Sequence, residues 1–108
     1  MNIVLTGGSG FIGSHLSKEL LKVDNNKLII VDNLLTGNLE NIQDILDHKN
    51  VTFIEHDVQD HIKIEEKVDY IFHLASAASP VAYTENPVNT LKAGSLGTIN
   101  TLGLARKH

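Results

Sequence analysis

The 108-residue sequence contains no cysteine, no long apolar run, no internal repeat and no low-complexity segment. Without cysteine the chain can form no disulfide and carry out no thiol chemistry, which is typical of a reducing compartment. No apolar run is long enough to span a bilayer. A predicted strand begins directly after Met1, so the N-terminus has no signal-peptide layout. These absences predict a cytoplasmic protein.

Positive charge is also scarce. The chain has 9 Lys and Arg against 13 Asp and Glu, a formal net charge of -4. This acidic balance argues against nucleic acid and anionic membranes as partners. Hydrophobic residues make up 42% of the sequence, which is enough for a core and argues against disorder. The length allows one small domain at most.

What the sequence does contain is a glycine-rich turn near its N-terminus. Residues 3–5 are a continuous apolar run, as expected for a strand covered on both faces. Gly7 lets the chain turn sharply, Gly10 leaves room for a pyrophosphate, and Gly13 lets the following helix lie close to the sheet. The first turn of that helix has free N–H groups that suit an anion. The glycines fit two dinucleotide-binding spacings, Gly8-x-Gly10-x-x-Gly13 and Thr6-Gly7-x-x-Gly10-x-x-Gly13.

An aspartate ends the second predicted strand. Asp32 follows the apolar residues 28–31 and lies 19 positions after Gly13. A strand before the glycines, a helix after them and an acidic residue about 20 positions on are the context of a dinucleotide site. The alternatives stay open at this point: a glycine-rich turn that binds nothing, and an aspartate that merely ends a strand.

The same aspartate predicts which dinucleotide binds. A carboxylate can accept hydrogen bonds from an adenosine ribose. It would repel a 2′-phosphate by roughly 4 kcal/mol per charge pair at 4 Å and an effective dielectric of 20. No Lys or Arg lies in the glycine turn, and none follows Asp32 before Lys49. The sequence therefore predicts NAD and not NADP as the cofactor.

The rest of the chain alternates predicted strands and helices. Strands are expected over residues 27–32, 51–54 and 69–75, and helices from Ile12, over 38–46 and from 86 onward, with a loop or short helix over 62–67 and a turn over 76–80. Right-handed crossovers then give a parallel sheet of strand order 3-2-1-4. The fold class is thus α/β, the N-terminal part of a Rossmann-type doubly wound sheet. Its fourth strand would be a long exposed edge, from which we expect a fragment or a truncated gene product.

Helical spacing predicts which residues face the core. Asn38 should cap the second helix, and Asn86 the last one, with Pro87 at its first position. The glycines of the last helix should allow close approach to a ligand, the sheet or a partner helix. The predicted inward residues are Ile12, Leu16, Leu20 and Leu21 in the first helix, and Val88, Leu91, Ser95, Ile99, Leu102 and Ala105 in the last.

The histidines are predicted to be structural. His73 lies in an apolar strand and is expected to be a hydrogen-bonded core residue. His56 and His61 have no third ligand at a suitable spacing, so they are expected to be solvated loop residues and not metal ligands. Ser76 and Ser79 lack the Gly-x-Ser-x-Gly elbow of a hydrolase nucleophile.

These motifs resemble the extended short-chain dehydrogenase/reductase family over the whole chain. Residues 6–13 match its Thr-Gly-x-x-Gly-Phe-Ile-Gly turn, and residues 31–33 and 73–75 match two further signatures. Within the family, residues 32–38, 56–58 and above all 78–105 resemble the UDP-glucuronate decarboxylases, which form UDP-xylose. One departure is Ala93-Gly94, where many relatives have Thr-Asn, so no role is carried over to these two positions.

The resemblance implies a cofactor site, a substrate site and a homodimer to which the last helix contributes. Tyr83, Lys92 and Asn100 would approach the UDP-sugar substrate or the far end of the cofactor. No metal is implied. The residues implied to hold NAD are Gly7, Gly10, Phe11, Ile12, Asp32, Asn33, Leu34, Thr36, Gly37, Asp57, Val58, Leu74, Ala75 and Ser76.

The reaction implied by the family passes a hydride from C4 of the sugar to NAD, releases the carboxylate as carbon dioxide and returns the hydride. It needs a Tyr base with a Lys four residues later. Tyr70 and Tyr83 are followed at that spacing by Leu74 and Pro87. The catalytic pair is therefore expected beyond residue 108, and the 108-residue chain alone is expected to be inactive. The alternatives are a sugar-nucleotide 4-epimerase or 4,6-dehydratase of the same family, or a non-catalytic nucleotide-binding module.

Overall fold

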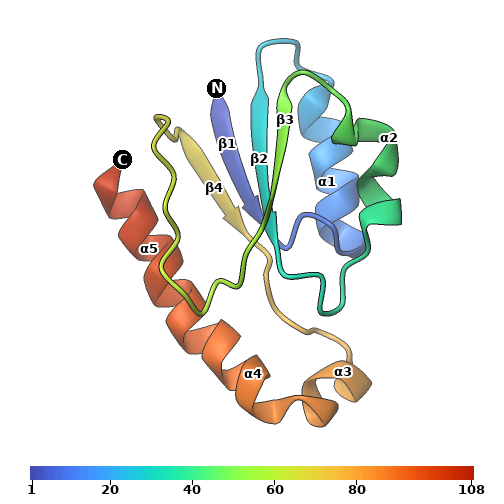
Figure 1. Cartoon of the computed structure of the whole chain (residues 1–108), viewed down its shortest axis with the longest axis vertical. Helices are drawn as coiled ribbons and strands as arrows, with labels where there is room; N and C mark the ends of the chain where they lie inside the picture. Colours follow the sequence, from blue (N-terminus) through green and yellow to red (C-terminus); the bar gives the residue numbers. More distant parts are fainter.

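A computed structural model describes all of residues 1–108 and contains one four-stranded parallel sheet (Figure 1). The strand order is β3-β2-β1-β4, which confirms the predicted order 3-2-1-4. Val4 in the middle of β1 pairs with Ile29 on one side and Ile71 on the other. The strands are β1 (Asn2–Thr6), β2 (Lys27–Asp32), β3 (Val51–Glu55) and β4 (Tyr70–His73).

The helices lie around this sheet, and the last three helical segments, residues 87–107, form one continuous bent rod (Figure 1). Residues on both sides of each junction in that rod keep right-handed helical angles. No helix of the chain has the length and apolar character needed to cross a membrane. The helices are α1 (Phe11–Leu21), the 3-10 turn η1 (Leu39–Ile42), α2 (Gln43–Leu46), α3 (Pro80–Glu85), α4 (Pro87–Lys92), the π-helical turn η2 (Ala93–Gly97) and α5 (Thr98–Lys107).

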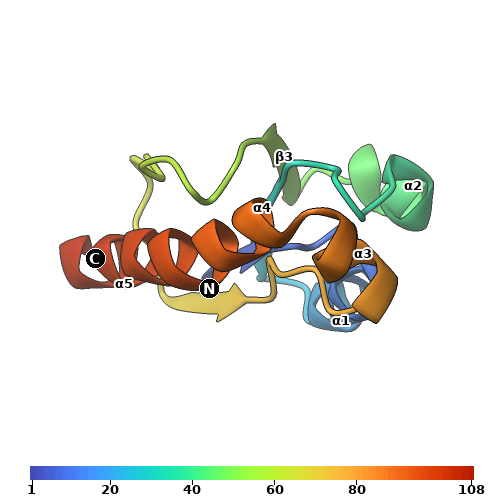
Figure 2. The same ribbon diagram turned by 90° about the horizontal axis from the view of Figure 1, so that it is seen from below.

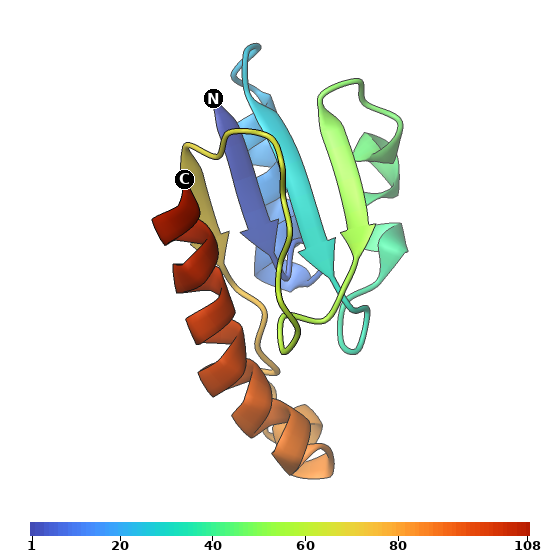
Figure 3. The ribbon, with the colours of Figure 1, turned by 60° about the vertical axis from the view of Figure 1, so that its left-hand side comes forward.

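The two faces of the sheet are covered by different kinds of structure. Helices α1 and α2 cover one face, while a long coil crosses the other (Figure 3). Seen from below, α1 and this coil lie on opposite sides of the molecule (Figure 2). The helical face buries Ile3, Leu5 and Leu28 against the half-buried leucines of α1. The alternation of apolar side chains along β1 and β2 therefore fills separate cores on the two faces of the sheet, and Ile30 adds a further cluster with Ile42 and Ile45.

The coil between β3 and β4, residues 56–69, supplies half of the buried residues of the second core. Its four apolar side chains are each at most 7% exposed and pack on Val4, Ile29 and Val31, with Leu104 from α5. This segment is a loop, the first of the two alternatives predicted for its central part. The buried residues of the coil are Val58, Ile62, Ile64 and Val68.

The structure confirms one predicted helix cap and corrects the other. The side-chain oxygen of Asn38 accepts a hydrogen bond from the Glu40 N–H at 2.9 Å at the start of η1. Asn86 makes no such bond, although Pro87 does begin α4. A helix that the sequence analysis did not predict, α3, ends directly before Asn86, and the Asn86 amide donates back to the Ala82 carbonyl at 3.5 Å.

The predicted inner stripe of the last helix is wrong. All six of its residues are exposed, and Leu91 reaches 72%. Gly97, Thr101 and Leu104 face inward instead. A Cβ at Gly97 would lie 2.7 Å from the Val58 Cγ2, so the helix packs closer than a larger residue allows. Close packing at Gly97 requires a small residue on the inner face, and hydrophobic spacing could not show this.

Candidate functional site

A cleft of about 530 Å³ opens at the carboxyl ends of the strands, next to the turn between β1 and α1. This is the edge of an open α/β sheet where ligands bind, at the point where the strand order reverses. Its walls come from the glycine turn, the segments that follow β2, β3 and β4, and helices α3 and α4.

The glycine turn has the shape that its spacing predicts. Gly7 has a φ of +74°, and a Cβ there would lie 2.6 Å from the Leu74 carbonyl oxygen. A Cβ at Gly13 would overlap the Gly7 carbonyl oxygen, so α1 begins in direct contact with the turn. A Cβ at Gly10 would meet protein only at 3.4 Å, and Gly10 lines the cleft. Only at Gly10 does the missing side chain leave free space for a ligand.

The first turn of α1 keeps its N–H groups available. No side chain caps the helix at Gly10, and no acidic residue lies in its first turn. Phe11 and Ile12 are 79% and 67% exposed and both line the cleft. The expectation that Ile12 belongs to a buried stripe is therefore wrong. An anion at this helix end would meet unpaired N–H groups and the positive end of the helix dipole.

Asp32 is buried and holds the backbone on both sides of the cleft entrance. It is 7% exposed, and its Oδ2 accepts the Ser9 N–H at 3.0 Å while its Oδ1 accepts the Leu34 N–H at 2.8 Å. A carboxylate offers about four acceptor sites. Two therefore remain for a ligand, and Asp32 lines the cleft.

The loop after β2 is bent by a leucine in the left-handed region. Leu34 has a φ of +60°, and its N–H is held by Asp32. Because of this bend Leu35 lines the cleft and Leu34 does not. Nothing in the sequence pattern indicated which of these two leucines would face a ligand.

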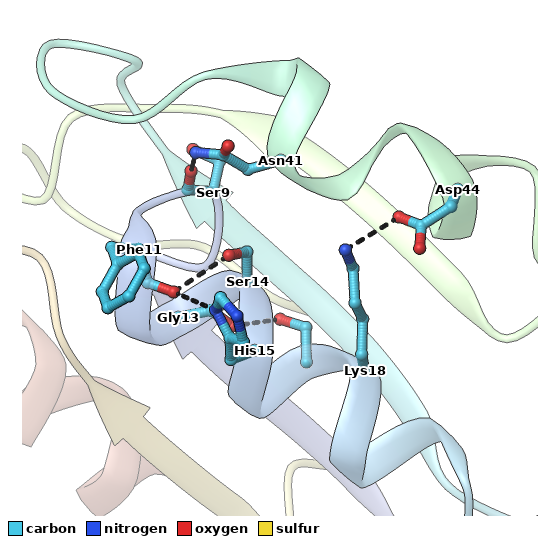
Figure 4. Close-up of polar contacts among 9 residues, drawn as sticks. Ser9, Phe11, Gly13, Ser14, His15, Lys18, Asn41 and Asp44 are labelled. Atoms are coloured by element: carbon cyan, nitrogen blue, oxygen red, sulfur yellow. Dashed lines mark hydrogen bonds and ion pairs between the residues drawn. The ribbon is translucent and has the colours of Figure 1, made fainter.

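Ser9 joins the glycine turn to this loop (Figure 4). Its carbonyl oxygen accepts the Asn38 N–H at 3.2 Å and the Asn41 side-chain amide at 2.9 Å. A Cβ at Gly37 would overlap the Ser9 hydroxyl, and it would lie 3.1 Å from Asp32 Oδ2. Figure 4 also shows the ion pair of Lys18 with Asp44 at 3.2 Å, which ties α1 to α2. The floor of the cleft is thus closely packed.

Further polar groups lie on the far walls of the cleft or behind them. Asp57, after β3, accepts the Gln59 N–H at 2.9 Å and the Asn33 amide at 3.3 Å. At the end of β4, His73 Nδ1 lies 2.7 Å from Thr6 Oγ1, which confirms a hydrogen-bonded histidine. Burial lowers the pKa of His73 below its usual value. No group of three or more His, Asp or Glu side chains is placed to hold a metal ion.

The comparison with protein families identifies the family of the chain. Residues 4–108 match the family described as GDP-mannose 4,6 dehydratase. The chain belongs to this family. Among its curated relatives, UDP-glucuronic acid decarboxylase 3 of Arabidopsis thaliana is 45% identical over 107 residues, which are 99% of this chain and 31% of the relative. UDP-glucuronic acid decarboxylase 1 of Danio rerio is 47% identical over 105 residues, 97% of this chain and 24% of the relative.

Solved structures of epimerases and dehydratases have the same fold. The dTDP-glucose 4,6-dehydratase of Bacillus anthracis, solved in complex with NAD, has a TM-score of 0.83 and 32% identity, covering 99% of this chain and 34% of that one. The UDP-glucose 4-epimerase of Thermotoga maritima, solved with UDP-glucose, has a TM-score of 0.76 and 33% identity, covering 95% and 33%. The resemblance stated from the motifs is confirmed, and the chain spans about a third or less of the relatives it matches.

The structure of this family member brings the predicted cofactor residues together. All of them except Leu34 line the one cleft. Further residues line the cleft that the sequence did not predict. Nothing in the sequence around them indicates a ligand contact, and only the fold brings them to the cleft. The missed residues are Leu35, His56, Gln59, Ala77, Ala78, Ser79, Ala82, Asn89, Thr90 and Ala93.

The three residues predicted to approach the substrate are not among the lining residues. Tyr83 and Lys92 are exposed. Asn100 is partly buried, and its amide donates to the Val58 carbonyl at 2.8 Å. Val58 itself lines the cleft, so Asn100 contacts the back of the wall.

Proposed function

We propose that residues 1–108 are the NAD-binding part of a UDP-glucuronate decarboxylase, which converts UDP-glucuronate to UDP-xylose and carbon dioxide. The single observation that carries the cofactor proposal is the cleft in which Gly10, the uncapped start of α1 and the buried Asp32 face the same space. The decarboxylase relatives, 45–47% identical over almost the whole chain, support the reaction.

These residues fit a dinucleotide. The free space at Gly10 and the N–H groups of Phe11 and Ile12 would hold the pyrophosphate. The two open acceptor sites of Asp32 would take the ribose hydroxyls, with Asn33, Thr36 and Gly37 around them, while Leu34 lies outside the lining and holds the Asp32 carboxylate through its N–H. NAD, when bound, would accept the hydride from C4 of the sugar and return it after carbon dioxide has left.

The remaining walls have assigned roles in the same proposal. Asp57 and Val58 would meet the adenine. The Leu74–Ser76 segment after β4 would line the path toward the nicotinamide, with the first glycine of the turn behind it. Tyr83 and Lys92 are proposed to approach the substrate, and Asn100 to act through Val58.

The preference for NAD over NADP belongs to this proposal. Asp32 would repel a 2′-phosphate, and no Lys or Arg lines the cleft. The proposal assigns the chain to the N-terminal part of an NAD-binding Rossmann domain. The substrate domain and a Tyr-x-x-x-Lys pair are assigned to residues outside these 108.

Calorimetric titration with NAD and NADP tests the cofactor proposal. Asp32→Ala is a poor probe, since it would also free the N–H groups of Ser9 and Leu34. For Asp32→Asn the quantity to compare is the ratio of NADP affinity to NAD affinity, because a structural defect that weakens both nucleotides equally leaves this ratio unchanged. We expect the ratio to rise about tenfold or more. Asp44→Asn, on an exposed carboxylate outside the cleft, is the control. A wild-type chain that binds neither nucleotide, or an unchanged ratio, contradicts the proposal.

A 4-epimerase or 4,6-dehydratase of the same family is the second candidate. Solved enzymes of both kinds match the fold at 32–33% identity. The full-length enzyme should release carbon dioxide from UDP-glucuronate and leave UDP-glucose and dTDP-glucose unchanged. Epimerisation or dehydration without decarboxylation would favour the second candidate. NAD binding without any turnover would favour a non-catalytic module.

A homodimer through the last helical rod is the final part of the proposal. Large apolar side chains on its outer side are 62–72% exposed, and such patches mark contact surfaces. We expect Leu91→Glu with Ile99→Glu to convert a dimer to a monomer in sedimentation experiments. Thr98→Glu, also exposed, is the control and should stay dimeric. A protein that is monomeric throughout contradicts this part alone.

A further inference from the structure

Three side chains meet behind the cleft, where β1, β4 and α5 join. None of them has a role in the function proposed above. Thr6 ends β1 and is fully buried. Its Oγ1 accepts the Ala75 N–H at 3.3 Å and also the Leu74 N–H at 3.2 Å, which is shared with the Thr6 carbonyl oxygen at 3.0 Å. These two bonds occupy both lone pairs of the hydroxyl oxygen. The hydroxyl can therefore only donate in its third contact, which is to His73 Nδ1 at 2.7 Å.

This donor assignment fixes the protonation of His73. Nδ1 must accept, so a neutral ring carries its proton on Nε2. Thr101 of α5 places its Oγ1 3.2 Å from the same nitrogen, where its hydroxyl can act as a second donor to a neutral Nδ1. Protonation of Nδ1 would set the ring N–H against the Thr6 hydroxyl proton at 2.7 Å. Burial lowers the pKa of His73, which favours the neutral ring that the geometry requires.

The network holds the cleft wall and does not touch the cleft. Thr6, His73 and Thr101 are absent from its lining, while Leu74 and Ala75 line it. The Leu74 carbonyl packs so closely on Gly7 that a Cβ there would lie 2.6 Å from it. A shift of this short segment would change the wall and the glycine turn together.

We propose that Thr6, His73 and Thr101 are positioning residues for the cofactor cleft, which hold the Leu74 and Ala75 peptide groups against Gly7 through a neutral histidine. This inference rests on the proposed NAD site and names residues that shape it without contacting the cofactor. A merely structural network would stabilise the chain without any selective effect on nucleotide affinity.

The first measurement is the tautomer of His73 in the unaltered protein, from its ring ¹⁵N chemical shifts at neutral pH. We expect a neutral ring with the proton on Nε2. A proton on Nδ1, or an imidazolium ring, overturns the inference. This measurement needs no variant and no nucleotide.

The second measurement compares Thr6→Val, which keeps the shape of the side chain, with Thr6→Ser, which keeps the hydroxyl. In Thr6→Val we expect faster hydrogen exchange at the Ala75 amide and NAD affinity weaker by about tenfold, while the Leu74 amide keeps its bond to the Thr6 carbonyl oxygen. Thr6→Ser should restore both to near wild-type values. Wild-type affinity and exchange in Thr6→Val, or equal losses in both variants, overturn the inference.

Two features keep the outcomes separate. If Thr6→Val does not fold, Thr101→Val removes only the second donor and should weaken NAD binding less than tenfold while His73 keeps its tautomer; unchanged affinity then overturns the inference. If the wild-type protein does not bind NAD, the proposed function is contradicted independently of this network. The His73 tautomer and the amide exchange rates then describe a network that only stabilises the fold.

Discussion

Helix α1 and the rod that ends in α5 both approach the sheet through small residues, yet α1 turns its leucines toward the core, while the rod turns all of its large apolar residues except Leu104 away from it. In α1, Gly13, Ser14 and Ser17 are buried, and the leucines beside them are half-buried against the core. In the rod, Gly97 and Thr101 are buried, while Leu102 is 64% exposed. A row of small residues thus marks the contact face of both helices. Hydrophobic spacing marks it only in α1.

The largest expected effect is at Gly13, where α1 contacts the glycine turn. A Cβ at Gly13 would overlap the Gly7 carbonyl oxygen and lie 2.8 Å from the Gly8 Cα. Neither atom can rotate away, because both belong to the backbone. We expect Gly13→Ala to lower the free energy of unfolding by about 3 kcal/mol or more and to abolish NAD binding. Denaturant unfolding and calorimetry measure the two effects. A stable variant would mean that α1 can move away from the turn.

Two leucines on α5 test which side of the rod faces the core. Leu104 is 2% exposed and Leu102 is 64% exposed, two positions apart on the same helix. We expect Leu104→Ala to cost about 3 kcal/mol of unfolding free energy, and Leu102→Ala to change it by less than about 0.5 kcal/mol in a monomer. The two variants have the same loss of volume and helix propensity, so each is the control of the other. Equal effects would remove the distinction between the two helices.

Acid should weaken the contact between the rod and the sheet. His73 takes up a proton in the unfolded chain near its ordinary pKa of about 6.5. Burial lowers the pKa of His73 in the folded chain, so unfolded molecules bind more protons in the window below 6.5. The free energy of unfolding should therefore fall as the pH drops through this window, and level off below the folded pKa.

The matched variant for this pH effect is His73→Asn, whose side-chain oxygen can accept from Thr6 without titrating. Its unfolding free energy should lose the part of the pH slope that His73 contributes, while the slopes of the other histidines remain. Identical slopes in the two proteins would show that His73 has the same pKa folded and unfolded.

The smallest expected effect is a gain. A Cβ at Gly103, in the middle of α5, would meet no atom within 4 Å. Gly103→Ala should raise the free energy of unfolding by about 0.5 to 1 kcal/mol, because alanine loses less backbone entropy in a helix. Thermal unfolding would detect this as a small rise in Tm. A loss instead of a gain would place another surface against this side of the rod.

The sequence was most informative where one residue must meet a local backbone requirement. Gly7, with its positive φ, and Gly13, with its backbone contacts, could be recognised from spacing alone. The strand order followed from the handedness of crossovers. The face of the rod could not be predicted, because it depends on the space that Val58 leaves for Gly97. Leu35 was missed as a lining residue for a similar reason: it faces the cleft only because Leu34 adopts a positive φ.

The coil between β3 and β4 sets an order of events when the chain folds. Its buried residues form no helix or strand of their own, so they gain stability only after β1 and β2 have paired and exposed a common apolar surface. Strands β1 and β2, joined through α1, pair across a shorter stretch of sequence than the one that separates the coil from Val4 or Leu104, so they can form earlier. We therefore expect the coil to dock last and to open first in the native state, so that the wall at Val58 is the part of the cleft with the least resistance to local unfolding.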